Sequence, residues 1–433
     1  MSRSASAGLD AGALGAWASA LAAADRARAE LVRSEAFARA QAELANSLAA
    51  LCESRGVRFP SSAGPAPSRE WPAGCSRRQI VWRYRSSVLY RFVPLRRRPA
   101  SAAPVLICFA LVNRPYVLDL APDCSLVRGL LAAGLEVYLL DWGYPGPEEW
   151  QTGLVDYIER HLDGGVQYIL TRHRVTALNL IGVCQGGTLS LCYAALHPRN
   201  VAGLVTLVTP VDFHTPDNVV GLWARGVDVE AIARLGNVPG SLLNAALLAL
   251  APAGARYGRY LGLLEHPPSG AALERFLRME RWIFDNPDQA GAAFAQFARW
   301  LYQENRLIRG TLQLGRRRVR LASIRGRVLN IYATRDHLVP PSCASALRKH
   351  LPGAEYAEVA VDAGHVGLYT GRSSVSLRER IAAWLLAGPC EPARISTRAS
   401  RAPRSQTAPR ARVVRSTRRT AAPATRTARA ARG

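Results

Sequence analysis

The middle of the chain alternates short runs of aliphatic residues with longer segments in which apolar positions recur at helical spacing. The aliphatic runs are bounded by polar residues, Gly or Pro, and they predict strands at 80–84, 88–92, 105–111, 135–142, 177–183, 204–209 and 328–333. Most of them are separated by helical segments such as 154–172 and 187–196. This alternation is typical of a mostly parallel sheet covered by helices on both faces.

One long segment departs from this alternation. Residues 214–309 show helical spacing and several aromatic residues but contain no convincing strand. We therefore expect a helical cap inserted between two strands of the sheet. The predicted catalytic domain, cap included, covers residues 76–390 of the 433-residue chain.

The two ends of the chain differ from the middle in composition. Residues 1–75 predict amphipathic helices followed by a linker rich in Pro, Ser and Gly. Residues 391–433 contain twelve arginines and one glutamate among Ala, Thr and Pro, a composition that predicts disorder.

The formal net charge of +24 would suit a nucleic-acid-binding protein. However, Lys349 is the only lysine, and such an arginine bias is also what a GC-rich genome produces. Two interpretations of the tail stay open: non-specific contact with nucleic acid, and compositional drift at a dispensable terminus. Deleting residues 391–433 and finding DNA retention unchanged at low salt would exclude the first.

The cysteines predict an intracellular protein. The eight cysteines are scattered and form neither a CxxC pair nor a Cys/His cluster at zinc spacing. No secretory signal and no membrane-spanning apolar run is recognisable in the sequence. We expect a cytoplasmic protein with reduced thiols, no metal site and no bound cofactor.

The run Gly182-Val183-Cys184-Gln185-Gly186-Gly187 carries the clearest chemical signal. A predicted strand enters it and a predicted helix leaves it, which is the context of the nucleophile elbow in α/β-hydrolases. Cys184 would then lie at a helix N-terminus, where the dipole favours a thiolate, and the Gln185 N–H would serve as one oxyanion donor. The alternative is a buried cysteine in a Gly-rich turn.

An acid and a base follow in the order that this fold requires, nucleophile, acid, base. Asp336 follows the last predicted strand, and His365 lies further on in a Gly-flanked loop. We predict His365 as the general base and Asp336 as the carboxylate that orients it. His337 and His214 are rival bases, of which His214 begins the predicted cap. Asp362 is a rival acid that is very close to His365 in sequence.

The second oxyanion donor is expected in the loop after the 105–111 strand. The N–H of Val112 is the candidate, and a plain strand exit is the alternative interpretation. A cysteine in place of serine favours acyl transfer, since exchange between thiolate and thioester is nearly isoenergetic. Coenzyme A is the expected acyl carrier, and it would leave as a product.

The sequence resembles the catalytic PhaC subunit of class III polyhydroxyalkanoate synthases, which polymerise hydroxyacyl-CoA into a storage polyester. The resemblance covers roughly residues 80–388. It is carried by the segments 110–116, 138–145, 178–187, 191–197, 208–213, 278–285, 336–341 and 364–367.

The resemblance implies an α/β-hydrolase fold and an acyl chain carried on Cys184, with His365 as base and Asp336 assisting the incoming hydroxyl. It also implies a PhaE-type partner subunit, self-association and attachment to a polymer granule. Asp141, Trp142 and Trp282 would be structural or would line a channel. The expected substrate is a short (R)-3-hydroxyacyl-CoA such as 3-hydroxybutyryl-CoA.

Two other functions remain open at this point. A thioesterase or depolymerase would use the same residues with water as acceptor, and a granule-tethering protein would carry a vestigial site. The N-terminal helical segment and the arginine-rich tail both extend beyond the family's usual catalytic subunit. The segment 1–75 is interpreted either as a spacer or as a substitute or dock for the partner subunit.

Overall fold

A computed structural model of the chain describes residues 74–96, 102–250, 270–371 and 374–388. Of the predicted N-terminal segment 1–75, with its helices and linker, only Gly74 and Cys75 are described, and the predicted arginine-rich tail 391–433 lies outside the described residues. No helix in the described ranges is both long and apolar enough to cross a membrane.

A sheet of eight strands forms the centre of the catalytic domain, in the order β1-β2-β4-β3-β5-β6-β9-β10. The pairs β1–β2 and β2–β4 are antiparallel, and every other neighbouring pair is parallel. The strands are β1 (Arg78–Tyr84), β2 (Ser87–Phe92), β3 (Val105–Cys108), β4 (Val137–Asp141), β5 (Leu178–Val183), β6 (Val201–Leu207), β9 (Arg327–Ala333) and β10 (Glu355–Val361). A separate hairpin pairs β7 (Gln313–Leu314) with β8 (Arg317–Arg318).

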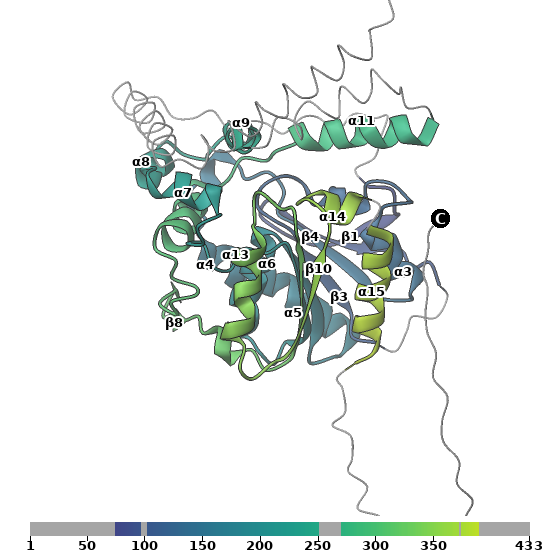
Figure 1. Ribbon diagram of the computed structural model, residues 1–433. Coiled ribbons are helices and arrows are strands. Elements are labelled where there is room, and N and C mark those ends of the chain that lie inside the picture. The colour runs from purple at the N-terminus through teal and green to yellow at the C-terminus, as the bar shows by residue number, and fades with distance from the viewer. Residues whose placement is uncertain (1–73, 97–101, 251–269, 372–373, 389–433) are drawn as a thin grey trace, which may run out of the picture. The chain divides into compact units, whose positions relative to one another are not determined.

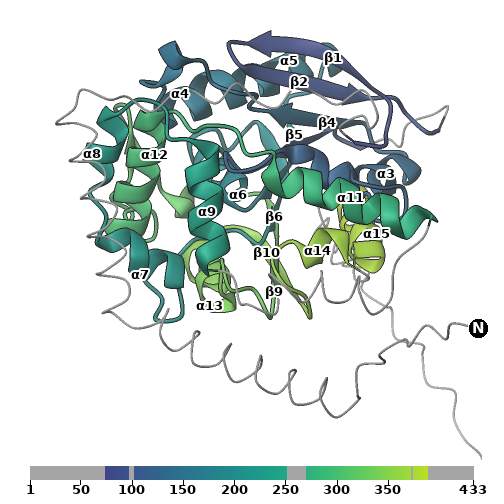
Figure 2. The same cartoon turned by 90° about the horizontal axis from the view of Figure 1, so that it is seen from above.

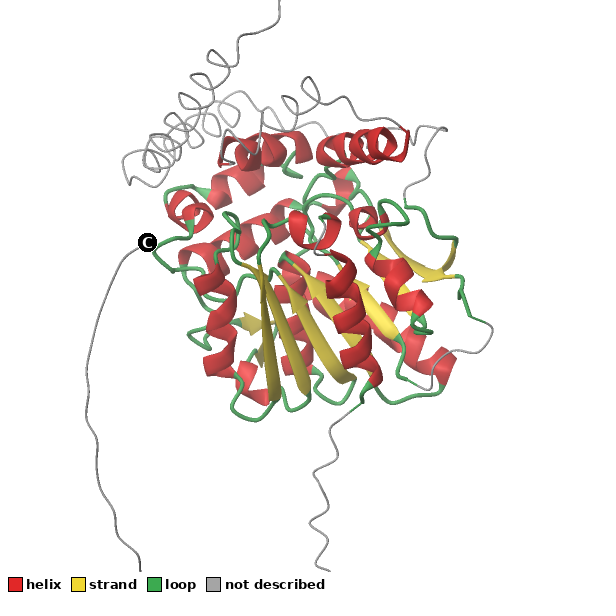
Figure 3. Ribbon diagram, turned by 45° about the vertical axis from the view of Figure 1, so that its right-hand side comes forward, coloured by secondary structure: helices red, strands yellow, loops and turns green. Residues whose placement is uncertain are grey.

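Helices pack on both faces of this sheet (Figures 1 and 3). One face carries α5 (Asp163–His173) and α6 (Gln185–Leu196), and the other carries α3 (Leu126–Ala132) and α15 (Ser374–Leu386). Alternate residues of one strand therefore enter two separate cores. In β3, Leu106 packs into the first core and Ile107 into the second, and both are fully buried. Burial on both faces explains why the parallel strands appear in the sequence as continuous aliphatic runs.

The cap follows β6 and lies over one end of the sheet, as the view from above shows (Figure 2). Its described helices are α7 (Val219–Arg225), α8 (Val229–Arg234), α9 (Gly240–Leu250), α11 (Gly270–Phe284) and α12 (Gly291–Phe297), which continues as the π-helical turn Ala298–Gln303. The predicted fold, an α/β-hydrolase with a mostly parallel sheet and an inserted helical cap, is confirmed.

The shorter elements complete the frame. They are α4 (Leu154–Asp156) with the π-helical Tyr157–Leu162, α13 (Pro341–Ser345), α14 (Gly367–Thr370), and the 3-10 turns Pro115–Asp119, Pro147–Glu149, Leu321–Ser323 and Ala346–His350. The predicted helix 154–172 is therefore continuous but changes its winding along its length.

Two strand predictions were incomplete. The strand predicted at 105–111 ends at Cys108, because the chain leaves the sheet there to form a loop beside the elbow. Strand β10 was missed, since Glu355 and Glu358 interrupt its apolar residues and it lies at the edge of the sheet. The predicted hairpin is present as β1 and β2, and Arg85 between them has a positive φ of 50°.

Candidate active site

Cys184 lies in the tight turn between β5 and α6, at the N-terminus of a 12-residue helix. Its backbone has φ 54° and ψ −125°, a combination that a residue with a Cβ atom rarely adopts. This strained turn directs the side chain away from the sheet, and Cys184 lines a cavity of about 110 Å³. The geometry is that of a nucleophile elbow.

The glycines of the elbow allow the close approach of backbone to backbone that this turn needs. A Cβ atom on Gly186 would meet the carbonyl oxygens of Cys108 and Phe109, at the end of β3. A Cβ atom on Gly187 would meet the side chain of Thr209. Gly186 and Gly187 are therefore required by packing.

Substituting Gly186 by alanine is expected to lower the free energy of unfolding by at least about 1–3 kcal/mol, because the new methyl group collides with backbone atoms that have little freedom to move. Denaturant unfolding followed by circular dichroism measures the loss. Gly367→Ala is the matched control, since a Cβ there meets nothing within 4 Å. Equal stability of the two variants would contradict this explanation of the turn.

His365 and Asp336 form a buried pair beside the cysteine. Nδ1 of His365 is 2.6 Å from Oδ2 of Asp336, and the residues are 7% and 5% exposed. The other carboxylate oxygen of Asp336 accepts hydrogen bonds from the N–H groups of Leu338 and Val339, each at 2.9 Å. These contacts fix the carboxylate and, through it, the imidazole ring.

Electrostatics favour a protonated His365. Burial by itself lowers the pKa of this histidine, but the Asp336 carboxylate and the Cys184 side chain, through charge and hydrogen bonds, together raise the pKa well above its usual value. The structure therefore brings the three predicted residues into one hydrogen-bonded group, in which an imidazolium faces the sulfur atom.

The rival residues lie elsewhere in the site or outside it. His337 is not among the residues that line the cavity, and burial lowers its pKa. Asp362 is exposed and pairs with Arg335 at 2.7 Å. His214 interacts through Nε2 with the backbone carbonyl oxygen of Tyr302.

Both predicted oxyanion donors belong to residues that line the same cavity, Gln185 from the start of α6 and Val112 from the loop after β3. The side-chain oxygen of Gln185 accepts a hydrogen bond of 3.2 Å from the N–H of Leu111. This bond ties the two segments together. No acceptor for the N–H of Val112 is found among the described residues, so that donor is available to a ligand.

Some residues of the site were not assigned to it from the sequence. The rest of the cavity wall includes Tyr302 from the cap and Tyr369 from α14. Burial and the negative charges of Cys184 and Asp336 raise the pKa of both phenols well above the usual value, so both remain protonated. Tyr302 is recognisable in the sequence only as one of several cap aromatics, because its position depends on how the cap packs.

The cap is fastened to the rim of the cavity by a buried polar network. Trp282 of α11 lines the cavity and donates from Nε1 to the carbonyl oxygen of Arg114 at 2.7 Å. Asp285, directly after α11, accepts hydrogen bonds from the hydroxyls of Tyr116 and Tyr144. Trp282 therefore lines the cavity and also holds the cap to its rim, a position that fits the predicted channel-lining or structural role.

The other two residues of that prediction lie deeper in the domain. Asp141 pairs with Arg114 at 2.7 Å. Trp142 is buried and donates from Nε1 to the carbonyl oxygen of Phe109 at 2.9 Å, so it supports the loop that follows β3. In the described parts of the chain, no group of three or more His, Cys, Asp or Glu side chains is arranged to hold a metal ion.

Comparison with known proteins identifies the family. Residues 103–372 match the α/β-hydrolase fold family. The chain is 45% identical over 318 residues to the poly(3-hydroxyalkanoate) polymerase subunit PhaC of Allochromatium vinosum, covering 72% of this chain and 89% of that protein. Identity is 43% to the PhaC subunit of Thiocystis violacea and 42% to that of Synechocystis sp., with coverage of 72% of this chain and 88% and 85% of those proteins. The resemblance seen in the sequence is thus confirmed, and the chain belongs to the poly(3-hydroxyalkanoate) polymerase PhaC family within the α/β-hydrolase fold.

Proposed function

We propose that this chain polymerises short (R)-3-hydroxyacyl-CoA, such as 3-hydroxybutyryl-CoA, into polyhydroxyalkanoate through an acyl group held on Cys184. The single observation that carries the proposal is the cysteine at a strained elbow, facing an imidazole that is raised in pKa and bonded to Asp336. Membership in a family of acyltransferases supports the same reaction class.

In the first step, the Cys184 thiolate attacks the thioester carbonyl. The new bond joins Sγ to the acyl carbon, the bond from that carbon to the CoA sulfur breaks, and the CoA thiolate takes the proton of His365. The backbone N–H groups of Val112 and Gln185 would stabilise the negative charge on the carbonyl oxygen during the attack.

In the second step, neutral His365 removes the proton from the hydroxyl of a second monomer or of a chain end. The alkoxide forms an ester with the acyl carbon and the bond to Sγ breaks, which restores the thiolate and the imidazolium. Asp336 holds the ring throughout and stabilises its positive charge. No bound cofactor or metal ion enters this sequence, and CoA leaves as a product.

The decisive experiment incubates the purified chain with 3-hydroxybutyryl-CoA and follows released CoA and the acyl product together. We expect CoA release to be matched by insoluble polyester. Free 3-hydroxybutyrate as the main product would instead identify a thioesterase, and CoA release equal to that of a Cys184→Ala variant would indicate a non-catalytic protein.

We further propose that the enzyme works in the cytoplasm on a polymer granule, as a homo-oligomer together with a PhaE-type subunit. The word "subunit" in the names of its relatives supports a partner. Measuring activity of the chain alone and with an added PhaE-type subunit tests this, and a rate unaffected by the addition would argue against the partner.

A further inference from the structure

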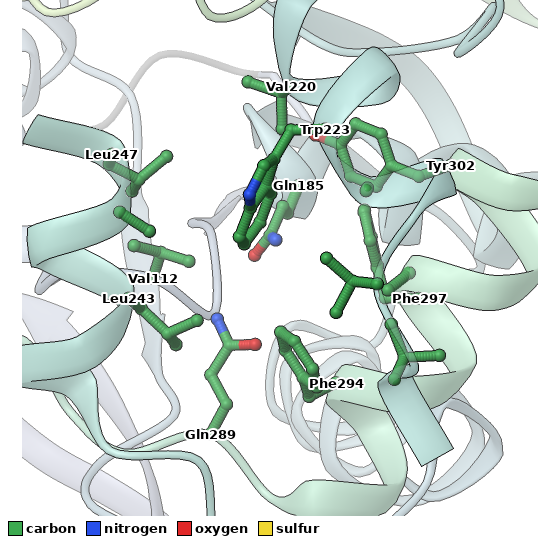
Figure 4. Close-up of a pocket in the computed structure, with 15 residues that line it drawn as sticks. Val112, Gln185, Val220, Trp223, Leu243, Leu247, Gln289, Phe294, Phe297 and Tyr302 are labelled. Carbon is green, nitrogen blue, oxygen red and sulfur yellow. The ribbon is translucent and has the colours of Figure 1, made fainter. Parts of the chain in front are cut away.

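A second cavity of about 100 Å³ adjoins the one that contains Cys184. The two share part of their walls, so they lie side by side, and we call the second the side pocket. The shared residues are Val112, Gln185, Val220, Leu247 and Tyr302. The remaining wall comes from the cap and is largely aromatic and aliphatic, with Trp223, Leu243, Phe294 and Phe297 prominent among its side chains (Figure 4).

The polar groups in this pocket are few. The wall contains no charged residue within the described part of the chain, and its two amide side chains belong to Gln185 and Gln289. The amide oxygen of Gln185 already accepts a hydrogen bond from the N–H of Leu111.

Gln289 differs, because its amide nitrogen is buried and has no hydrogen-bond partner, although the residue is only 5% exposed. Its amide points into the pocket between Leu243 and Phe294 (Figure 4).

The backbone holds Gln289 in this place. Its N–H donates to the carbonyl oxygen of Val238 at 2.9 Å, and the N–H of Val238 donates back at 2.8 Å. Burying a donor without an acceptor is unfavourable, so this group calls for an acceptor, which a ligand bound in the pocket would supply. The pocket therefore suits an aliphatic ligand that carries a carbonyl oxygen.

We propose that this side pocket holds the polyester segment next to the acyl group on Cys184, and that Gln289 donates a hydrogen bond to its ester carbonyl. The inference rests on the proposed polymerase function and names the subsite for the growing chain. A polyester consists of aliphatic units with carbonyl acceptors and no donors, which matches both the apolar wall and the buried unpaired nitrogen of Gln289.

Size and charge favour this occupant over coenzyme A. A cavity of about 150 Å³ binds benzene, which has as many non-hydrogen atoms as one 3-hydroxybutyrate unit, so a pocket of about 100 Å³ has room for no more than about one such unit. The phosphates of coenzyme A need cations, and none lines the pocket in the described residues.

The test compares two acyl donors, 3-hydroxybutyryl-CoA and the CoA thioester of the linear 3-hydroxybutyrate dimer, which contains one ester. Rapid-quench measurement of the first CoA released gives the acylation rate of Cys184 with each donor. Gln289→Met, which keeps the size but removes the donor, is expected to lower the ratio of dimer rate to monomer rate about fivefold to tenfold. Its melting temperature is expected to equal or exceed that of the wild type, because an unpaired buried amide has been removed.

Gln296→Met is the matched control, from helix α12, which begins two residues after Gln289. The amide oxygen of Gln296 accepts a 2.7 Å hydrogen bond from the N–H of Leu154 and lies outside the pocket. This control is expected to lower the melting temperature and leave the rate ratio unchanged. A second variant, Ala246→Phe, fills the pocket and is expected to lower the ratio about tenfold.

The subsite proposal would be overturned if Gln289→Met and Ala246→Phe left the ratio of dimer rate to monomer rate unchanged, whether or not both rates fell equally. Failure of the polymerase proposal looks different: the wild type would then release free hydroxyacid or no CoA, whatever the ratio between the donors.

Discussion

Replacing Cys184 by alanine is expected to lower the rate of CoA release from 3-hydroxybutyryl-CoA by at least about 10³-fold, with the fold intact. The loss follows from the proposed mechanism, in which Sγ forms the bond to the acyl group. The side chain is only partly buried and faces a cavity, and alanine keeps its Cβ atom, so the elbow is expected to keep its shape. Continuous detection of free CoA measures the rate, and circular dichroism checks the fold.

Cys184→Ser separates two explanations for that loss. If the thiolate is what makes the site reactive, the serine variant is also far slower than the wild type, since a hydroxyl is a much weaker nucleophile at neutral pH. Full turnover in the serine variant, together with its loss in the alanine variant, would contradict the thiolate mechanism. Cys192→Ala is a suitable control, because that cysteine belongs to α6 and is buried in the core, outside the cavity wall.

Asp336→Asn is expected to lower polymerisation about 10²- to 10⁴-fold, by analogy with the orienting carboxylate of serine hydrolases. The same substitution is expected to change the pH dependence of Cys184 alkylation. In the wild type the raised pKa of His365 keeps the imidazolium present at neutral pH, and a positive charge beside a sulfur atom makes it more reactive toward alkylation. Without the carboxylate, burial dominates and lowers the pKa of His365, so the imidazolium is lost at lower pH.

Alkylation of Cys184 by iodoacetamide at pH about 7 is therefore expected to be slower in Asp336→Asn than in the wild type. The alkylation rates of the two proteins converge near pH 10, where thiols ionise without help. Iodoacetamide is expected to label Cys184 in preference to three buried cysteines, because burial raises the pKa of Cys108, Cys192 and Cys343 to about 12. Subtracting the labelling of a Cys184→Ala variant removes the signal of all other cysteines.

Asp362→Asn is the control for that experiment, since this carboxylate is exposed and pairs with Arg335 instead of His365. It is expected to leave both the rate and the alkylation profile unchanged. An Asp336→Asn variant with the wild-type profile would show that the carboxylate does not control the charge of His365.

Much of the fold could be predicted from local patterns. Strands such as β4 and β5 are buried on both faces, so their aliphatic runs are distinct from the surrounding sequence. Strand β10 lies at the edge, where half of the residues face water and Glu355 fits as well as an apolar residue would. The end of β3 was also misplaced, because residues 109–111 remain buried after leaving the sheet.

The three residues of the candidate triad could be found because each follows a strand or a Gly-rich turn in a fixed order. The residues that form the walls of the two cavities could not be found from the sequence in this way. Tyr302 and Gln289 belong to the cap, and they meet the elbow only when segments more than a hundred residues apart in sequence pack together. Nothing in the neighbouring sequence of Gln289 marks it, since its significance is a missing hydrogen-bond partner.

The strained turn at Cys184 has a practical consequence for capturing the enzyme with its substrate. Gly186 abuts backbone atoms and Gly187 abuts the Thr209 side chain, so neither tolerates a side chain of its own, whereas the cysteine side chain lines a cavity. Chemistry and scaffold can therefore be separated by mutation: a chain without the thiol retains the shape of the binding surface. A crystal of the Cys184→Ala protein soaked with acyl-CoA would thus hold the intact thioester, ready to be imaged before any bond is broken.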